Sequence, residues 1–464
     1  MEELPLTELT AVSPIDGRYG SRTKELRAYF SEYALQRYRT KIEVEYLIAL
    51  SEWHLVRGLN DVERDMLRDK YSSFSLATGE AIKGHEKITN HDVKAVEYEI
   101  KERLKGSNLE DLLEMVHFGL TSYDINDNAL YLMIKEGMES VYVPKLIELE
   151  KRLVDFAKQY RELPMLARTH GQPASPTTLG KEFSVFAYRL AKEICQLQDF
   201  KYPGKLNCAT GNYNALQAAF PLVSWPDFSE DFLGNLGLEP SLITTQIEPH
   251  DKLVEWFQLM TRINNIVTDF DQDVWRYISD DWIVQKPKKE EVGSSTMPHK
   301  INPIDFENSE GNVVVANGLF SAFVSRLQQS RLQRDLVDST ITRNVGVAVA
   351  HSLLAVKSTI GGLGKISANE QEIEKALSEH PEILSEAYQT ILRREGVEMP
   401  YERLKELTRG KKVSLADMHT FIDTLDIPYS VKTELKRILP ENYIGIAPGL
   451  VDIALTDIDA LIKK

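Results

Sequence analysis

Two long stretches of the sequence repeat apolar side chains at steps of three and four residues. One runs from Leu179 to Leu197 and the other from Leu253 to Tyr277. Because an α-helix turns once every 3.6 residues, this spacing places the apolar side chains along one face of a helix. The second helix is predicted from about residue 249 to 280, a length of roughly 48 Å at 1.5 Å per residue. Long helices with one apolar face pack against each other, so the spacing predicts a helical bundle.

Three further long helices are predicted, at residues 124–160 with a bend at Pro144, at 307–332 and at 335–365. Alternation of apolar and polar residues is too sparse to predict a major sheet. Apolar residues also lie off the main seam of the long helices, which predicts burial against other subunits of a homo-oligomer. We therefore expect an all-α fold with a helical region at 1–111, a five-helix bundle at 112–365 and a smaller helical region at 366–464.

The composition excludes several classes of protein. The 464 residues carry a formal net charge of −15, which argues against general nucleic-acid binding and against adsorption to anionic membranes. Cys195 and Cys208 are too few for a disulfide framework or a zinc site, and we expect reduced thiols in a cytoplasmic protein. The first residues do not resemble a signal peptide, and we expect no membrane-spanning segment because no run of about 18 apolar residues occurs.

The stretch 293–303, GSSTMPHKINP, joins two of the predicted helices and must be a loop, because it contains glycine and two prolines. It carries two adjacent hydroxyl groups, Ser294 and Ser295, followed by His299, Lys300 and Asn302. Such groups bind anions or move protons. A polar surface loop is the alternative, but we favour a mobile active-site lid over residues 285–303.

Two helix starts are predicted to bind an anion. Thr89 and Asp92 are spaced as a capping box that opens a helix, with His91 at its mouth. Thr121 and Asp124 repeat this spacing, and His117 and Ser122 lie beside them in the sequence. A plain capped helix with an exposed histidine explains the first start equally well. Two such starts, each near a histidine, indicate a ligand with several negative charges.

Other polar residues lie at predicted turns or helix ends. His170 follows Thr169 in a turn fixed by glycine and proline, where catalysis is favoured over a local structural role. Arg334 and Arg343 are nine residues apart, so a helix break near Asp335 is needed to bring both to one ligand. For Arg18 and Tyr19 the spacing alone favours an ordinary N-terminal turn, and Gln246 ends an irregular region near one end of the bundle.

These groups together suit acid–base chemistry on an anionic substrate. No Cys/His metal spacing and no glycine-rich phosphate or dinucleotide motif occurs, so we expect no cofactor. An elimination beside a carboxylate needs a base for the carbon-bound proton, cations or N–H groups for the developing negative charge, and an acid for the leaving group. The sequence contains each of these groups.

The loop GSSTMPHKINP resembles the GSSxMPxKxNP pattern of the aspartase/fumarase superfamily, whose members break C–N or C–O bonds and release fumarate. The stretches TNHDVKAVEY, HFGLTSYDIND, RTHGQPASP, TTQIEPHD and PYERLKELTRG are similar to the longer bacterial type of its adenylosuccinate lyase branch. The resemblance implies three helical domains around a five-helix bundle and a homotetramer with a core of twenty helices. It also implies active sites shared between subunits.

By this resemblance Ser294 is the general base and His170 the general acid, while His117 supports the pocket. The remaining site residues would bind the substrate, with Asn90, His91 and Asp92 near the phosphate or the acid. The succinyl part is assigned to Thr121, Ser122, Gln246, Ser295, Lys300 and Asn302, with Asn308 in the matching flank, and the nucleotide to Arg18, Tyr19, Arg334, Ser339 and Arg343.

The implied reactions convert adenylosuccinate to AMP and the succinyl-carboxamide ribonucleotide (SAICAR) to AICAR, both in purine biosynthesis. An argininosuccinate lyase, or another fumarate-releasing lyase, is the nearest alternative, although its substrate would not need the phosphate-binding arginines. A non-catalytic helical-bundle protein is the alternative of another class. The presence of Ser294, His170 and Lys300 argues against that class.

Overall fold

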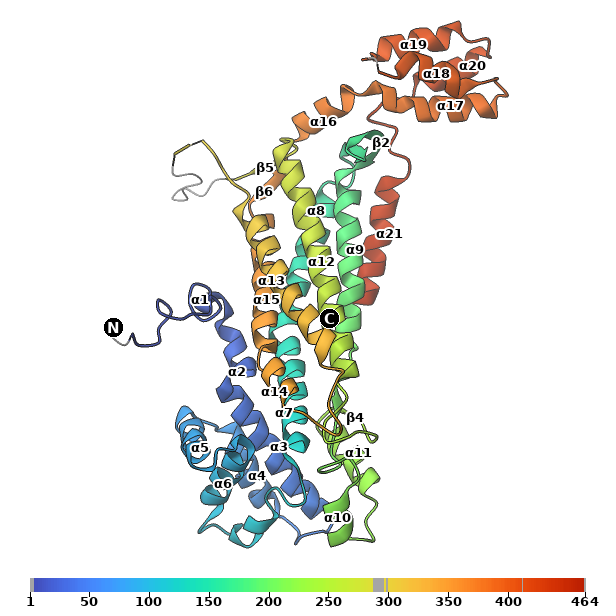
Figure 1. The fold of residues 1–464 in the computed structure, drawn as a ribbon. Helices are drawn as coiled ribbons and strands as arrows, with labels where there is room; N and C mark the ends of the chain where they lie inside the picture. The colour runs from blue at the N-terminus through green and yellow to red at the C-terminus, as the bar shows by residue number, and fades with distance from the viewer. Residues whose placement is uncertain (1–3, 287–295, 298, 411, 463–464) are drawn as a thin grey trace. The chain divides into compact units, whose positions relative to one another are not determined.

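The structure is a computed structural model that describes residues 4–286, 296–297, 299–410 and 412–462. The chain forms two compact units. The first comprises residues 1–145, 196–264 and 311–355, and the second comprises residues 146–195, 265–310 and 356–464. Five long helices contribute residues to both units (Figure 1): α8 (Val143–Gln159), α9 (Leu179–Gln198), α12 (Asp251–Ser279), α13 (Ile304–Arg326) and α15 (Val345–Leu363).

The long helices predicted from apolar spacing are confirmed, with two corrections. The segment predicted at 335–365 is not one helix, because α14 (Val337–Thr342) ends and α15 begins at Val345. The helix predicted to reach residue 332 ends at Arg326. Next to the predicted bend at Pro144, α7 (Ser122–Gly137) is joined to α8 by a π-helical segment, Met138–Tyr142. Proline has no N–H to donate, which accounts for an irregular turn just before it.

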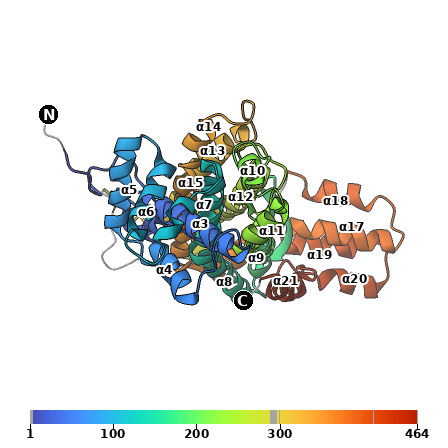
Figure 2. The same ribbon diagram turned by 90° about the horizontal axis from the view of Figure 1, so that it is seen from below.

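The first unit is built on two helices that lie side by side in both views (Figures 1 and 2), α3 (Glu32–Glu52) and α7. The other elements around them are α1 (Gly20–Thr23), η1 (Lys24–Leu26), α2 (Arg27–Phe30), α4 (Asp61–Ser72), α5 (Leu76–Thr89), α6 (Asp92–Leu104), η2 (Glu110–Met115), β3 (Pro203–Gly204), α10 (Asn214–Ala219), α11 (Trp225–Asn235) and β4 (Glu239–Pro240). Helix α5 was not predicted. It contains Gly79 and Gly84, which lower the intrinsic helix propensity of its sequence.

The second unit holds two antiparallel strand pairs and a set of short helices. Strand β1 (Pro164–Thr169) pairs with β2 (Gln172–Thr178), and β5 (Ile283–Gln285) pairs with β6 (Ile366–Ala368). The helices after β6 are α16 (Glu370–Ser378), η4 (Pro381–Leu384), α17 (Ser385–Arg394), α18 (Pro400–Thr408), α19 (Leu415–Thr424), α20 (Tyr429–Lys436) and α21 (Ala447–Leu461). Every strand in the described ranges belongs to a two-stranded sheet, so the expectation of no major sheet is confirmed there.

Aromatic side chains fill the core of each unit. In the first unit Tyr46 packs edge-on against Phe228 and Phe232. In the second, Phe156 stacks on Phe183, which meets Phe270 edge-on. In the part of the chain that the structure describes, one stretch, Val337–Leu363, is long and apolar enough to cross a membrane, but 72% of its most apolar window is buried, as in a core helix.

A buried ion pair fixes the start of α7. Asp124 and Lys205 are both fully buried, and Asp124 Oδ1 accepts a hydrogen bond of 2.7 Å from Lys205 Nζ. The same oxygen accepts from the backbone N–H groups of Asn207 and Cys208, while Oδ2 accepts from the N–H of Thr121 at 2.9 Å. The capping box predicted for Thr121 and Asp124 is therefore confirmed. It also ties the first turn of α7 to residues 205–208.

Replacing Lys205 with Met should lower the midpoint of thermal unfolding, because Asp124 would remain as an uncompensated buried charge. Breaking a buried pair in this way costs about 3–5 kcal/mol. The matched control is Lys252→Met, which removes an exposed i,i+3 pair with Glu255 and should cost less than about 1 kcal/mol. Equal unfolding midpoints for the two variants would contradict the role given to Lys205.

Candidate active site

The turn between α5 and α6 positions three of the predicted site residues. The prediction that Thr89 opens a helix is wrong. Thr89 is the last residue of α5, and the N-cap of α6 is His91. Between them, Asn90 adopts a left-handed conformation (φ 52°), and its N–H donates to the carbonyl oxygen of Glu86. This conformation ends α5. Asparagine is among the few residues that tolerate this conformation at a helix end.

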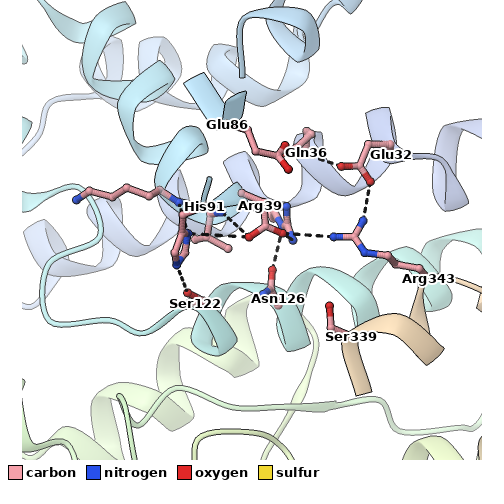
Figure 3. Close-up of polar contacts among 12 residues, drawn as sticks. Glu32, Gln36, Arg39, Glu86, His91, Ser122, Asn126, Ser339 and Arg343 are labelled. Atoms are coloured by element: carbon pink, nitrogen blue, oxygen red, sulfur yellow. Dashed lines mark hydrogen bonds and ion pairs between the residues drawn. The ribbon is translucent and has the colours of Figure 1, made fainter. Parts of the chain in front are cut away.

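The side chain of His91 has one nitrogen committed to capping α6. Nδ1 accepts a hydrogen bond of 3.1 Å from the backbone N–H of Lys94. An accepting Nδ1 carries no proton, so neutral His91 carries its proton on Nε2. This Nε2 lies 3.4 Å from Ser122 Oγ, at the first residue of α7. The two predicted helix starts therefore meet, and His91 is a hydrogen-bond donor between them (Figure 3).

Asp92 lies between two guanidinium groups. Its Oδ2 is 2.6 Å from Arg39 and 3.4 Å from Arg343, and its Oδ1 accepts from the N–H of Val93. Burial alone would raise the pKa of Asp92, but the charges of the two arginines outweigh it and hold that pKa below its usual value. Asp92 is therefore an ionised anchor for Arg39 and Arg343.

Arg39 and Arg343 differ sharply in exposure. The side chain of Arg39 is 3% exposed and donates to Asn126 of α7 at 2.8 Å, so it is a fixed part of the fold. The side chain of Arg343 is 45% exposed and also pairs with Glu32, at 2.9 Å. Figure 3 shows both arginines in one row of polar groups with His91 and Ser122 at its end. Of the two, Arg343 is the one that an incoming anion can reach.

Arg334 and Gln246 are also brought together. The guanidinium carbon of Arg334 lies 3.9 Å from the centre of the Tyr123 ring, and Nη1 donates to Gln246 Oε1 at 3.3 Å. Gln246 donates in turn to the carbonyl of Ala209. The helix break expected near Asp335 is confirmed, since α13 ends at Arg326 and α14 begins at Val337.

A cavity of about 240 Å³ lies in the first unit beside these residues. Helices α3, α7, α14 and α15 contribute to its wall. The polar and charged side chains that line it are Ser31, Glu32, Arg39, Tyr123, Asn126, Asp127, His250, Asp338, Ser339, Thr342 and Arg343. Ser339 and Arg343, predicted from the sequence, thus line one cavity together with Arg39.

Arg18 and Tyr19 do not line this cavity. Arg18 is exposed in the turn before α1 and makes no hydrogen bond or ion pair with another described residue, while Tyr19 is the residue before that helix.

His117 is held by a residue that the sequence did not single out. Its Nδ1 lies 2.6 Å from Glu43 Oε1, and the side chain of Glu43 is fully buried. Burial would lower the pKa of His117, but Glu43, helped by Glu97 and Asp124, raises it above the ordinary value. His117 is therefore the positive partner of a buried carboxylate, and its support of the pocket stays a prediction.

The remaining predicted residues that are described belong to the second unit. His170 and Gly171 form the two-residue turn between β1 and β2, with φ values of 53° and 73°. Positive φ at both positions is typical of the type I′ turn, which matches the twist of a hairpin. The exposed side chain of His170 is thus presented at the tip of a hairpin that the sequence did not predict.

The described part of the predicted lid leads into α13. Lys300 is exposed, and its N–H donates to the carbonyl of Met297. Asn302 lies in the segment directly before α13, and Asn308, within α13, accepts from Ser358 of α15 at 2.9 Å. Ser294 and Ser295 lie outside the described residues, so their roles stay predictions.

The residues that sequence reasoning missed share a pattern on α3. Glu32, Gln36, Arg39 and Glu43 follow one another at steps of four, three and four, so they lie on one face of the helix. Gln36, Arg39 and Glu43 are at most 2% exposed. Because buried polar side chains need partners, a polar stripe at helical spacing between apolar residues is the signal that could have identified them.

Within the described residues, one group of potential metal ligands gathers outside this site. His85 of α5 lies 3.6 Å from Glu99 and 3.3 Å from Glu102 of α6. These are ordinary ion-pair distances between neighbouring helices, and they account for the arrangement without a metal. We assign no metal to the candidate site.

Replacing Glu43 with Gln should lower the midpoint of thermal unfolding by an amount that depends on pH. The pKa of His117 is higher in the folded state than in the unfolded state, where it is about 6.5. Protonation of His117 therefore stabilises the folded state fully below about pH 6.5. This stabilisation is lost as the pH rises through the pKa of the folded state. The difference in unfolding midpoint between wild type and variant should therefore be largest near about pH 6 and shrink at higher pH. Glu45→Gln is the control on the same helix, because Glu45 pairs with Arg68, which does not titrate there. A difference that grows with pH would contradict the assignment.

Comparison with known proteins gives the family. A family profile described as "Lyase" matches residues 17–318, and one described as "Adenylosuccinate lyase C-terminal" matches residues 330–444. The adenylosuccinate lyase of Dictyostelium discoideum is 49% identical over 460 residues, covering 96% of this chain and 98% of that protein. Those of Legionella pneumophila (strain Corby) and Escherichia coli (strain K12) are 47% and 46% identical, each covering 97% of this chain and 99% of the relative.

Solved structures give the same fold. A fumarate lyase from Mesorhizobium sp. BNC1 matches with a TM-score of 0.74 at 16% identity, and a 3-carboxy-cis,cis-muconate lactonizing enzyme from Pseudomonas putida with 0.74 at 18%. Each match covers 94% of this chain and 97% of the other. The expected all-α fumarase-like fold is confirmed. The chain belongs to the adenylosuccinate lyase family of the aspartase/fumarase superfamily.

Proposed function

We propose that this protein cleaves adenylosuccinate into AMP and fumarate by acid–base β-elimination. The observation that carries the proposal is the set of Arg39, Ser339 and Arg343 around one cavity, next to His91 and Ser122. Bidentate arginine suits a phosphate group. Relatives that are 46–49% identical over nearly the whole chain bear the name adenylosuccinate lyase.

In the proposed reaction Ser294 removes a proton from the succinyl carbon next to a carboxylate. The electron pair forms the carbon–carbon double bond of fumarate as the carbon–nitrogen bond breaks, and His170 supplies a proton to the leaving nitrogen. A serine hydroxyl is a weak base, so its alkoxide needs stabilisation, which we assign to Lys300 and to N–H groups of the loop. The hairpin tip leaves the His170 side chain exposed, as a group that meets substrate requires.

We assign one set of residues to the nucleotide part of the substrate and another set to its succinyl part. Arg334, Ser339 and Arg343, with Arg18 and Tyr19, would hold the nucleotide and chiefly its phosphate. Thr121, Ser122, Gln246, Ser295, Lys300 and Asn302 would hold the succinyl part, and Asn308 would also bind the substrate. His91, as a donor through Nε2, would contact an acceptor at the junction, flanked by Asn90 and Asp92.

Several further statements belong to the same proposal. The enzyme would also convert SAICAR to AICAR, because the leaving nitrogen carries the same succinyl group in both substrates. It would work in the cytoplasm as a homotetramer whose active sites combine residues of different subunits, with three domains per chain divided near residues 111 and 365. No cofactor takes part in the proposed steps.

The rival activity is that of an argininosuccinate lyase, which uses the same elimination on a substrate without phosphate. The arginines at the cavity favour the nucleotide, because guanidinium groups bind a phosphate well and argininosuccinate carries none. A non-catalytic bundle would have no need of the exposed hairpin histidine or of Lys300.

The purified protein should release fumarate from adenylosuccinate and not from argininosuccinate. Both reactions are followed by the appearance of fumarate under identical conditions. Release from argininosuccinate alone would overturn the phosphate assignment while keeping the elimination. No release from either substrate would favour the non-catalytic alternative.

Replacing Ser294 with Ala should leave the assembly intact and lower kcat by about 10²–10⁴-fold, the usual contribution of a general base. Size-exclusion chromatography checks the assembly, and steady-state kinetics the turnover. Ser295→Ala is the matched control, and it should raise KM more than it lowers kcat because Ser295 is assigned to binding. A kcat for Ser294→Ala close to that of wild type would remove Ser294 from the mechanism.

A further inference from the structure

A buried group of ionisable side chains lines the cavity and has no part in the proposed chemistry. His250, directly before α12, is 1% exposed, and Asp338, in the first turn of α14, is 6% exposed. His250 Nε2 lies 3.9 Å from Asp338 Oδ2. On the other side of the ring, Nδ1 lies 3.8 Å from Glu248 Oε2. The imidazole thus lies between two carboxylates.

The hydrogen bonds around His250 indicate its protonation. Tyr131 donates its one hydroxyl proton to Glu248, so this hydroxyl can only accept from His250 Nδ1, which is 3.2 Å away. Nδ1 therefore carries a proton. If Nε2 carried none, its lone pair would face the Asp338 carboxylate, which is unfavourable.

The surrounding charges favour the doubly protonated ring. Burial would lower the pKa of His250, but Asp338, Asp127 and Glu248 together raise it above the ordinary value. Burial likewise would raise the pKa of Asp338, but His250 and Tyr123 hold it below its usual value. The pair is an imidazolium and a carboxylate.

Three segments that carry candidate binding residues meet at this imidazolium. Asp127 and Tyr131 belong to α7, whose first residue is Ser122, and Asp127 Oδ2 accepts from the N–H of Glu248 at 2.8 Å. Glu248 and His250 follow Gln246 in the sequence. Asp338 directly precedes Ser339 and lies on the same short helix, which ends beside Arg343.

The backbone at His250 is strained. Its φ of 63° lies in the left-handed region, which is costly for a residue with a side chain. Its N–H donates to Glu248 Oε2 at 2.8 Å, which helps to hold this conformation. Glycine would adopt it without strain but would lose the imidazole.

The pair is held by charge rather than by a hydrogen bond. Among the described residues, His250 Nε2 and Asp338 Oδ1 have no hydrogen-bond partner, although both are buried. Removing His250 would therefore leave the buried Asp338 without its cationic partner, and removing the charge of Asp338 would leave the imidazolium paired only with carboxylates outside α14. The change should affect α14 first, because Asp338 lies in the first turn of this six-residue helix.

We propose that His250 is a positioning residue, whose imidazolium holds Asp338 and thereby fixes α14 so that Ser339 and Arg343 face the cavity. The part that concerns the ligand rests on the proposed function. The part that concerns α14 does not, because anchoring is a property of the free protein.

His250→Gln and Asp338→Asn should each raise KM for adenylosuccinate about tenfold and change kcat much less, since the proposed acid and base are elsewhere in the sequence. The double variant should be no worse than the worse single variant, because each change removes the same interaction. In the free protein, hydrogen exchange of the amides of residues 337–343 should become faster in both single variants, while exchange in α13 stays as it is.

His351→Gln is the matched control. His351 is also buried in the first unit, where Nδ1 lies 2.8 Å from Asn312 Oδ1, and it does not line the cavity. It should lower the unfolding midpoint without changing KM or the exchange at 337–343. If the His250 variant does not fold, Asp338→Asn alone decides the outcome.

Two results would overturn the proposal. One is unchanged exchange at residues 337–343 in both single variants. The other is an equal fall of kcat and unfolding midpoint with KM unaltered, as expected for a general loss of stability. If wild type does not turn over adenylosuccinate, the proposed function fails, but faster exchange at 337–343 would still support the anchoring of α14.

Discussion

The complete burial of a charged Asp124 is the constraint on which the first unit depends. Removing a carboxylate from water costs several kcal/mol unless donors surround it. Here the donors are the N–H of Thr121, the ammonium group of Lys205 and two N–H groups of residues 207–208. These donors come from the start of α7 and from a segment about eighty residues later, so the two must meet. Asn207 in turn binds Thr244, two residues before Gln246. The position of Gln246, which binds the Arg334 guanidinium stacked on Tyr123, thus follows in part from the neutralisation of one carboxylate.

How far the sequence predicts the structure depends on whether the determining contact is local. The long helices were predicted because their apolar spacing is repeated over many turns, and the cap at Thr121 because both partners lie within four residues. At Thr89 the same local pattern failed. Asn90 adopts a left-handed conformation that ends α5, so the cap passes to the imidazole of His91. The capping box of Thr89 and Asp92 competed there with the tendency of Asn90 to end a helix, and the sequence does not show which of the two is stronger. The role of Ser294 rests on the loop motif alone, because the residue lies outside the described part of the chain.

The partners of the buried polar residues on α3 were not predicted, because each is fixed by a contact over a long distance in sequence. Arg39 is a mid-helix residue that could equally have been solvated at the surface. Its function depends on Asp92 and Asn126, 53 and 87 residues away. Glu43 contacts His117, which is 74 residues away in the sequence. Helical spacing shows that Glu32, Gln36, Arg39 and Glu43 share a face, but only the packing of α3 against α7 turns that face inward.

The different exposure of Arg39 and Arg343 gives the site a fixed and an exchangeable cation. The pair between Arg39 and Asp92 is largely buried, so breaking it would be costly and it keeps its geometry. The pair between Arg343 and Glu32 joins side chains that are 45% and 41% exposed, and such pairs contribute about 0–1 kcal/mol. A phosphate carries up to two charges and can accept two parallel hydrogen bonds from a guanidinium, so it competes well with one half-exposed carboxylate. Glu32 is also bound by Lys83 and Gln36, and it therefore keeps partners when Arg343 leaves. Arg343 can thus leave Glu32 at little cost and turn to a ligand of the proposed site. Asp92, its other partner at 3.4 Å, stays paired with Arg39 in the wall of that site.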